Sequence, residues 1–146
     1  MSANIKEIAH RVCEELWSRV DLRVADEIIA PGCVFHVHDP ITPALERGPE
    51  GAQKAVAIYR RAFPDLKITI EDTIAEGDKV MIRWTSHGTH SGPLMGLAPT
   101  YAKVTATGID VYRIDFGMIR EIWVNWDAMG FMQQLGVEPM AQGAQA

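Results

Sequence analysis

The sequence predicts an α+β fold in which helices come first and an antiparallel sheet comes last. Two observations support this prediction: apolar residues recur at helical spacing near the N-terminus, and from residue 66 onward the chain reads as strands separated by turns. Helices that precede an antiparallel sheet pack on one of its faces. We expect a long first helix across a strongly curved sheet to leave a pocket at one end.

The N-terminal half contains three predicted helices. Asn4 is expected to cap the first helix and Asp21 the second, which Pro31-Gly32 ends. The expected elements are a helix over 4–20, a short second helix, a brief strand over 33–38, a loop over 39–49 and a helix over about 50–63.

The C-terminal half predicts a four-stranded antiparallel meander followed by a short helix. The expected strands cover 66–75, 80–90, 101–114 and 119–127. A helix over 128–135 follows at once and ends at Gly136, a good helix terminator. We expect one domain over 1–146, with its core at about 4–136 and a frayed tail over 137–146.

Composition excludes several classes of protein. The chain is 47% apolar and 23% charged, as in an ordinary soluble domain, and its net charge is −5. Nothing therefore suggests nucleic acid or a membrane as a partner, and we expect a cytoplasmic protein. Cys13 and Cys33 are too few for a disulfide framework, so we expect both to be small buried hydrophobes.

The predicted last strand has two distinct faces. Alternation places Glu121, Trp123, Asn125 and Asp127 on one face and Ile122, Val124 and Trp126 on the other. Because a tryptophan is out of place in water, we expect the first face to line the pocket. We expect the second face to pack against another surface.

Five segments of the chain form a recognisable set. They are AFPDL (62–66), AEGDKVMIRW (75–84), GTHSG (88–92), Pro99-Thr100 and IREIWVNWDAMGFMQQLG (119–136). This set resembles the SnoaL-like polyketide cyclases, and the resemblance covers residues 4 to 136. It implies the cone-shaped α+β fold of the NTF2-like (cystatin-like) superfamily. The segments Tyr101-Ala102-Lys103 and Asp115-Phe116-Gly117-Met118 depart from the usual pattern.

The resemblance also implies a reaction. Characterised cyclases of this family close a ring of a polyketide ester by intramolecular aldol condensation, without a metal or an organic cofactor. An aspartate at the end of the last strand is their general acid/base, which by position is Asp127 here. Because the superfamily has many activities, two alternatives stay open. One is a non-catalytic small-molecule-binding domain, and the other is a hydrolase with a water activated by Asp127, Asn125 and a histidine.

Two residues are catalytic candidates. Asp127 could take a proton from carbon and return it to the new alkoxide if an apolar pocket raises its pKa. It also stands directly before a helix, where an aspartate N-cap contributes about 1 kcal/mol. His90 ends a strand beside a glycine-containing loop, where it could stabilise an enolate or simply bond the loop backbone.

Four residues are expected to bind the substrate: Trp123, Asn125, His36 and Arg83. Trp123 offers a face for stacking, and Asn125 shares its side of the strand. Arg83 could hold an ester or carboxylate or form a surface ion pair, and only one of Arg83 and Trp84 can point into the pocket. His36 and His38 share a strand face, but no third ligand at matching spacing indicates a metal site.

The chain is also expected to form a homodimer through the outer face of its sheet. Ile122, Val124 and Trp126 would give that face an apolar patch of a kind that is uncommon on monomers. The expected ligand is a hydrophobic, carbonyl-rich small molecule held in the internal pocket.

Overall fold

The computed structural model describes residues 4–137 and confirms the α+β architecture. The elements in chain order are α1 (Ile5–Arg11), a π-helical segment η1 (Val12–Ser18), α2 (Arg23–Ile28), β1 (Ile29–Val37), α3 (Pro49–Ala62), β2 (Lys67–Glu76), β3 (Lys79–Thr89), β4 (Lys103–Asp115), β5 (Met118–Trp126) and α4 (Ala128–Gln134). Almost all of the predicted tail lies outside the described residues.

The sheet has five strands in the order β1-β5-β4-β3-β2. Strands β2 to β5 form the predicted antiparallel meander, and β1 adds a parallel edge strand beside β5. Strand β1 begins at Ile29, so Pro31-Gly32 lies inside the strand, and the prediction that it ends a helix was wrong. The register of β1 shifts between Ile29 and Val34, and an irregular edge strand is a position where proline is tolerated.

The helix ends agree with the sequence at three of the five predicted points, Pro31-Gly32 being one of the two exceptions. Asn4 caps α1 by accepting a hydrogen bond from the Lys6 N–H, and Asp127 caps α4. Gly136 takes a φ of +78° just after α4, as a helix-terminating glycine does. The prediction that Asp21 caps the second helix was wrong: the N-cap is Leu22, and the Asp21 carboxylate instead lies 3.2 Å from the Arg23 guanidinium.

The first predicted helix, over 4–20, is two segments of different geometry. Helix α1 gives way at Val12 to η1, in which the wider π-helical turn runs to Ser18. Such π-helical turns are rare and often accompany functional sites. Cys13 lies on η1 and is free and buried, as is Cys33 on β1, which confirms the prediction for both cysteines.

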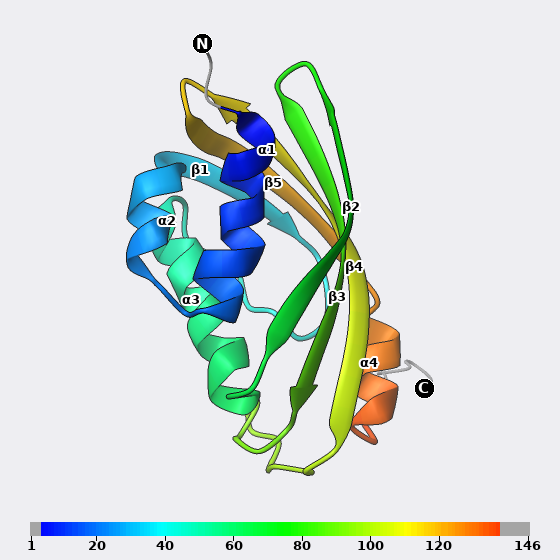
Figure 1. The fold of residues 1–146 in the computed structure, drawn as a ribbon. Helices are drawn as coiled ribbons and strands as arrows, with labels where there is room; N and C mark the ends of the chain where they lie inside the picture. Colours follow the sequence, from blue (N-terminus) through cyan, green and yellow to red (C-terminus); the bar gives the residue numbers. More distant parts are fainter. Residues whose placement is uncertain (1–3, 138–146) are drawn as a thin grey trace, which may run out of the picture.

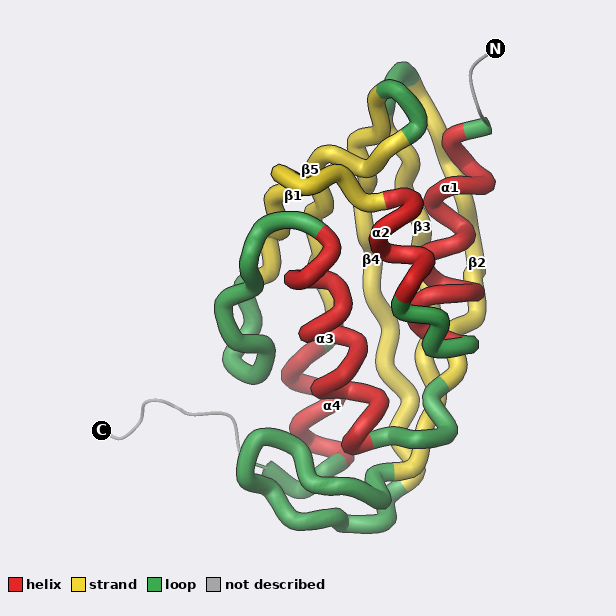
Figure 2. The backbone as a smooth tube through the Cα atoms, turned by 90° about the vertical axis from the view of Figure 1, so that its left-hand side faces the viewer, coloured by secondary structure: helices red, strands yellow, loops and turns green. Residues whose placement is uncertain are grey.

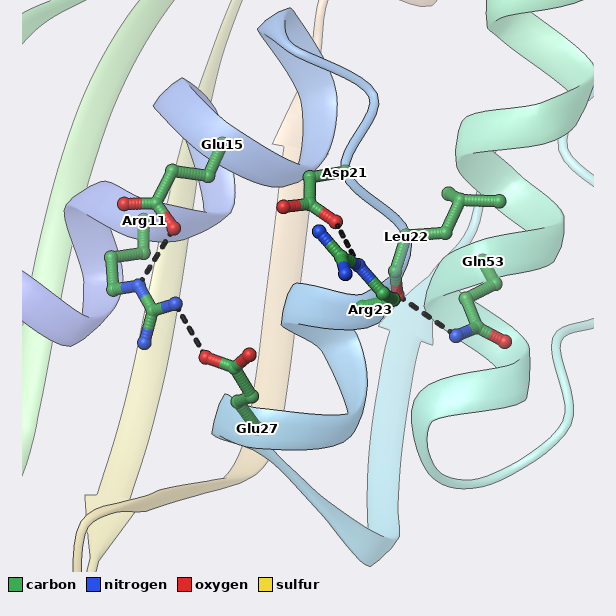
Figure 3. A network of polar contacts seen from close by, with 7 residues as sticks. All are labelled: Arg11, Glu15, Asp21, Leu22, Arg23, Glu27 and Gln53. Atoms are coloured by element: carbon green, nitrogen blue, oxygen red, sulfur yellow. Dashed lines mark hydrogen bonds and ion pairs between the residues drawn. The ribbon is translucent and has the colours of Figure 1, made fainter.

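The N-terminal helices form a layer over one face of the sheet (Figure 1). Seen from that side, α1, α2 and α3 stand in front of the strands (Figure 2). Polar contacts on the outside of this layer tie it together: Arg11 donates to Glu15 and Glu27, at 2.9 and 2.7 Å, and Gln53 of α3 donates to the Leu22 carbonyl (Figure 3). None of the helices in the described part of the chain is long and apolar enough to cross a membrane.

The pairing of the strands decides which side chains face the helices. Trp84 of β3 pairs with Gly108 of β4, which pairs with Trp126 of β5. Two residues along, and so on the same face, Asp110 of β4 pairs with Val124 of β5. Partners in register point to the same side of a sheet, so these five residues share the inner face.

Candidate active site

A cavity of about 150 Å³ lies between the helical layer and the inner face of the sheet. Its walls come from η1, β1, residues 38–48, α3, the inner face of the sheet and α4. The lining is mainly aliphatic and aromatic, and it includes no lysine, arginine or histidine from the described residues. The residues with polar side-chain groups in the lining are Cys13, Trp17, Thr42, Tyr59, Trp84, Ser86, Asp110, Tyr112 and Trp126.

The face of β5 that lines this cavity is the apolar one. Ile122, Val124 and Trp126 border the cavity, so the sequence prediction that the opposite face does so was wrong. The physical reason is that the cavity wall is also the hydrophobic core: Ile122 is buried, and Val124 packs against the main core cluster. The uncovered outer face tolerates the mixed set of side chains.

Among the described residues, Asp110 is the only carboxylate in the lining. It lies mid-strand on β4, and both of its oxygens accept hydrogen bonds from neutral donors. The Trp84 indole N–H donates to Oδ1 at 3.0 Å, and the Tyr112 hydroxyl donates to Oδ2 at 2.6 Å. Each carboxylate oxygen keeps a second lone pair, so the group can still accept a proton from a ligand.

Burial changes the acidity of this group. Removal from water raises the pKa of Asp110 to about 6, although the hydrogen bonds from Tyr112 and Trp84 oppose the shift. Burial also raises the pKa of the Cys13 thiol, and the nearby Asp110 charge adds to that effect. Cys13 is therefore a neutral thiol in the wall, and Asp110 is the group of this pair that titrates near neutral pH.

The indole that bonds Asp110 lies over a glycine. A Cβ added to Gly108 would stand 2.3 Å from Cζ2 of Trp84 and 2.8 Å from Cβ of Trp126. A side chain at residue 108 would therefore displace one of the two tryptophans that flank it. The glycine leaves room for Trp84 to cross β4 and reach the carboxylate.

A second polar group borders the same cavity. The Thr42 and Tyr59 hydroxyls share a hydrogen bond of 2.6 Å. Asp39, at the start of the same loop, accepts hydrogen bonds from the N–H groups of Ile41 and Thr42 through Oδ1 and from the Trp126 indole through Oδ2. One carboxylate therefore fixes both the loop that carries Thr42 and a tryptophan of the wall.

The profile of the SnoaL-like polyketide cyclases matches residues 7–135. The chain belongs to this family. A search of curated proteins found no match.

Solved structures agree with the family and with an NTF2-like fold. A candidate polyketide cyclase from Acidithiobacillus ferrooxidans is 31% identical, with 93% of this chain and 96% of that chain covered and a TM-score of 0.80. TsrD from Streptomyces laurentii is 28% identical, with 90% and 94% covered and a TM-score of 0.79. AclR, a candidate hydroxylase from Streptomyces galilaeus, is 27% identical, with 92% and 96% covered and a TM-score of 0.78. Similar chains thus carry names of different reaction classes.

In this SnoaL-like chain, Asp127 lies outside the cavity. Its side chain is exposed, and Oδ1 accepts a hydrogen bond of 2.9 Å from the Gly130 N–H at the start of α4. It is not among the residues that line the cavity. Its place is that of an N-cap, so the structure offers Asp110 rather than Asp127 as the carboxylate that a bound ligand meets.

His90 is buried but is likewise absent from the cavity lining. Its Nδ1 accepts a hydrogen bond of 3.1 Å from the Thr100 N–H, so the proton of the neutral ring is on Nε2. That Nε2 has no hydrogen-bond partner among the described residues. Burial lowers the pKa of His90. Its contacts hold the loop before β4 against β3, which is the structural role that the sequence left open beside catalysis.

The predicted binding residues lie on the outer face of the sheet. His36 stacks on Trp123 with ring centroids 5.2 Å apart, and its Nε2 lies 2.7 Å from Glu121. The hydrogen bond from His36, with a smaller effect of Arg113, holds the pKa of Glu121 below its usual range. The expectation that Trp123 and His36 line the pocket was therefore wrong.

Asn125 and Arg83 are also directed away from the cavity. Asn125 is exposed on the outer face of β5. Arg83 is exposed and lies 2.7 Å from Asp72, so it forms a surface ion pair while Trp84 takes the inner position. The sequence reasoning missed Asp110, although a carboxylate on the apolar side of a predicted strand is a recognisable signal.

Proposed function

We propose that this chain is a cofactor-independent acid/base enzyme of the cyclase type, with Asp110 as its general base and acid. The observation that carries the proposal is the position of Asp110, held by two neutral donors inside an apolar cavity with its pKa raised to about 6. A carboxyl group that titrates near neutral pH can both take and return a proton. Membership of a family of polyketide cyclases supports the same reaction class.

The proposed reaction needs only proton transfers and one new carbon–carbon bond. The Asp110 carboxylate removes a proton from a carbon next to a carbonyl, which leaves an enolate. The enolate carbon attacks a second carbonyl carbon of the same molecule, and the electron pair of that C=O bond moves to its oxygen. The protonated Asp110 then gives its proton to this alkoxide, so the product is an isomer of the substrate.

The substrate is expected to be neutral. Within the described residues, the cavity lining includes no cationic side chain that would pair with a free carboxylate. A bound anion would also lie in the same apolar space as Asp110, where like charges repel strongly. A hydrophobic molecule with several ketone or ester carbonyls meets both conditions.

Proton exchange at a model ketone tests the proposal without the natural substrate. 2-Tetralone is a neutral bicyclic ketone with acidic protons next to its carbonyl. In D₂O, we expect the protein to accelerate loss of the α-proton NMR signal with saturation kinetics. The maximal exchange rate should rise with pH through about 6 and then level off, because the ionised form of Asp110 is the base. A binding domain would bind 2-tetralone without accelerating the exchange, which would contradict the proposal.

We also propose that the outer face of the sheet is a homodimer interface. A row in register across all five strands is mainly apolar: Ile74, Met81, Val111, Trp123 and His36. Ion pairs flank the row, with Arg83–Asp72 on one side and Arg113–Glu121 on the other. An apolar centre with a charged rim is the usual anatomy of an interface. The patch predicted from Ile122, Val124 and Trp126 was wrong, because those side chains face the cavity.

A lysine at the centre of this row tests the interface. Val111 is half-buried on the outer face of β4, between Met81 and Trp123. We expect Val111→Lys to convert a dimer to a monomer in analytical ultracentrifugation, because an unpaired charge would be buried between the subunits. A wild-type monomer, or a variant of unchanged mass, would contradict the interface.

A further inference from the structure

We infer that the Tyr59–Thr42 hydroxyl pair is a second polar subsite of the cavity, which binds a carbonyl or hydroxyl oxygen of the same neutral ligand whose acidic carbon meets Asp110. This deepens the proposed function, on which it rests for the role of Asp110. Both hydroxyl residues line the cavity that Asp110 borders. Among the described residues, no hydrogen bond connects the pair with the group formed by Asp110, Trp84 and Tyr112.

The hydrogen-bond capacity of the pair decides what it can bind. Two hydroxyls carry two hydrogens, and their mutual bond of 2.6 Å uses one of them. Whichever oxygen is the donor, one O–H hydrogen and several lone pairs remain for a ligand. Burial raises the pKa of Tyr59, so its phenol stays neutral. A neutral donor that can also accept suits a carbonyl or hydroxyl oxygen and gives no charge to pair with an ion.

The two hydroxyls are held in place from both sides. On one side, Asp39 fixes the loop through the N–H groups of Ile41 and Thr42. On the other, the Tyr59 ring packs between aromatic rings, with its centroid 6.1 Å from that of Trp17 and 6.0 Å from that of Trp126. A polar group whose geometry is fixed before binding loses less entropy when a ligand arrives.

The strand pairing relates the two polar groups to neighbouring positions on the inner face of the sheet. Tyr59 packs on Trp126, which pairs with Gly108, and Asp110 is the next inner-face position along β4. Successive positions on one face of a strand are on the order of 7 Å apart. A ligand that meets both groups therefore carries its acidic carbon and its second oxygen at separate positions, as a fused bicyclic ketone with a distal hydroxyl does.

Two probes that differ by one hydroxyl test the subsite. 6-Hydroxy-2-tetralone carries an oxygen at each end, whereas 2-tetralone lacks the distal one. By isothermal titration calorimetry, we expect the wild-type protein to bind the hydroxylated probe about 5- to 10-fold more tightly, the effect of one neutral hydrogen bond. Either hydroxyl alone would still offer an O–H to the ligand, so both are removed together. In the double variant Tyr59→Phe/Thr42→Val the preference should fall below about 2-fold, while the affinity for 2-tetralone stays the same, because the volume of the cavity wall is nearly unchanged.

Controls separate the subsite from general packing. Tyr101→Phe makes the same chemical change at a tyrosine that is 70% exposed and outside the cavity lining, so it should keep the preference. If the double variant does not fold, Tyr59→Phe and Thr42→Val are measured separately, and each should lower the preference, because the remaining hydroxyl loses the partner that orients it. A wild-type protein that binds neither probe or shows no preference would overturn the inference, as would a full preference that survives removal of both hydroxyls.

The readout also distinguishes the subsite from the proposed reaction. Calorimetry reports binding and does not depend on turnover. A hydroxyl preference lost in the double variant Tyr59→Phe/Thr42→Val, without any catalysed exchange, would support the subsite and contradict the enzyme. Catalysed exchange without a hydroxyl preference would support the enzyme and contradict the subsite.

Discussion

Replacing Asp110 by asparagine is expected to slow the catalysed proton exchange at least about 100-fold at pH 7.5, because an amide cannot take the proton from carbon. The fold should survive. The new side chain can accept from the Trp84 indole through its oxygen and donate to the Tyr112 hydroxyl through its nitrogen, so both existing partners at 3.0 and 2.6 Å keep a hydrogen bond. NMR exchange rates for the two purified proteins, each saturated with the model ketone, give the comparison.

Asp127→Asn is the matched control. It makes the same chemical change at an exposed aspartate outside the cavity lining, whose carboxylate caps α4. Asparagine is about as good an N-cap as aspartate, so we expect an exchange rate within about 3-fold of the wild type. If Asp127→Asn abolished exchange and Asp110→Asn did not, the general base would be Asp127, as the family resemblance implied.

The same Asp110 substitution is expected to stabilise the protein above pH 6. The folded-state pKa of about 6 exceeds the usual 3.8, so the stabilising effect of this group is complete below pH 3.8 and is lost as pH rises through 6. At pH 7.5 we expect urea unfolding to show Asp110→Asn more stable by about 1–2 kcal/mol, with the difference shrinking towards pH 4.5. A variant less stable at pH 7.5 would mean that the carboxylate is a structural anchor.

The fold was largely predictable because its signals are local. Helical spacing, the turn at Gly77 and the helix-ending Gly136 each act over a few residues, and the elements they mark are present. The parallel pairing of β1 with β5 had no such signal, since it joins residues about ninety positions apart. The wrong prediction at Pro31-Gly32 has the same cause. Locally, this pair is typical of a helix end, and only the pairing of β1 with β5 shows an irregular strand there.

The site was harder to predict because the ligand cavity and the hydrophobic core share one face. The sequence placed the polar face of β5 in the pocket, because Trp123 looked unsuited to water. In the structure the His36 ring covers Trp123 on the outer face. The better signal was on β4, where Asp110 and Tyr112 interrupt an otherwise apolar series of alternate residues. A buried polar residue is more informative than an exposed aromatic one.

Gly108→Ala is expected to lower the stability of the protein and to shift the pH dependence of the catalysed exchange. The added Cβ would stand 2.3 Å from Cζ2 and 2.7 Å from Cε2 of Trp84, and Trp126 Cβ at 2.8 Å closes the other side. The Trp84 indole must therefore move. Its Nε1 is covalently bonded to Cε2, so it then loses its hydrogen bond to Asp110. We expect urea unfolding to show a loss of about 1–3 kcal/mol from overpacking. The rising part of the plot of exchange rate against pH, here called the pH limb, should move upward by about one pH unit. The reason is that one of the two donors that lower the pKa of Asp110 is gone.

Two further variants separate the steric effect from the electrostatic one. Trp84→Phe removes the indole N–H without adding an atom to the strand, so it should reproduce the upward shift of the pH limb through the same loss of a donor to Asp110. Gly32→Ala adds a Cβ that meets nothing within 4 Å, so it should change neither stability nor the pH limb. If Gly108→Ala kept the wild-type pH limb while Trp84→Phe moved it, the displaced indole in Gly108→Ala would still donate a hydrogen bond to the carboxylate. If neither variant moved the limb, the Trp84 bond would not control the charge of Asp110, and burial and the Tyr112 bond would set its pKa.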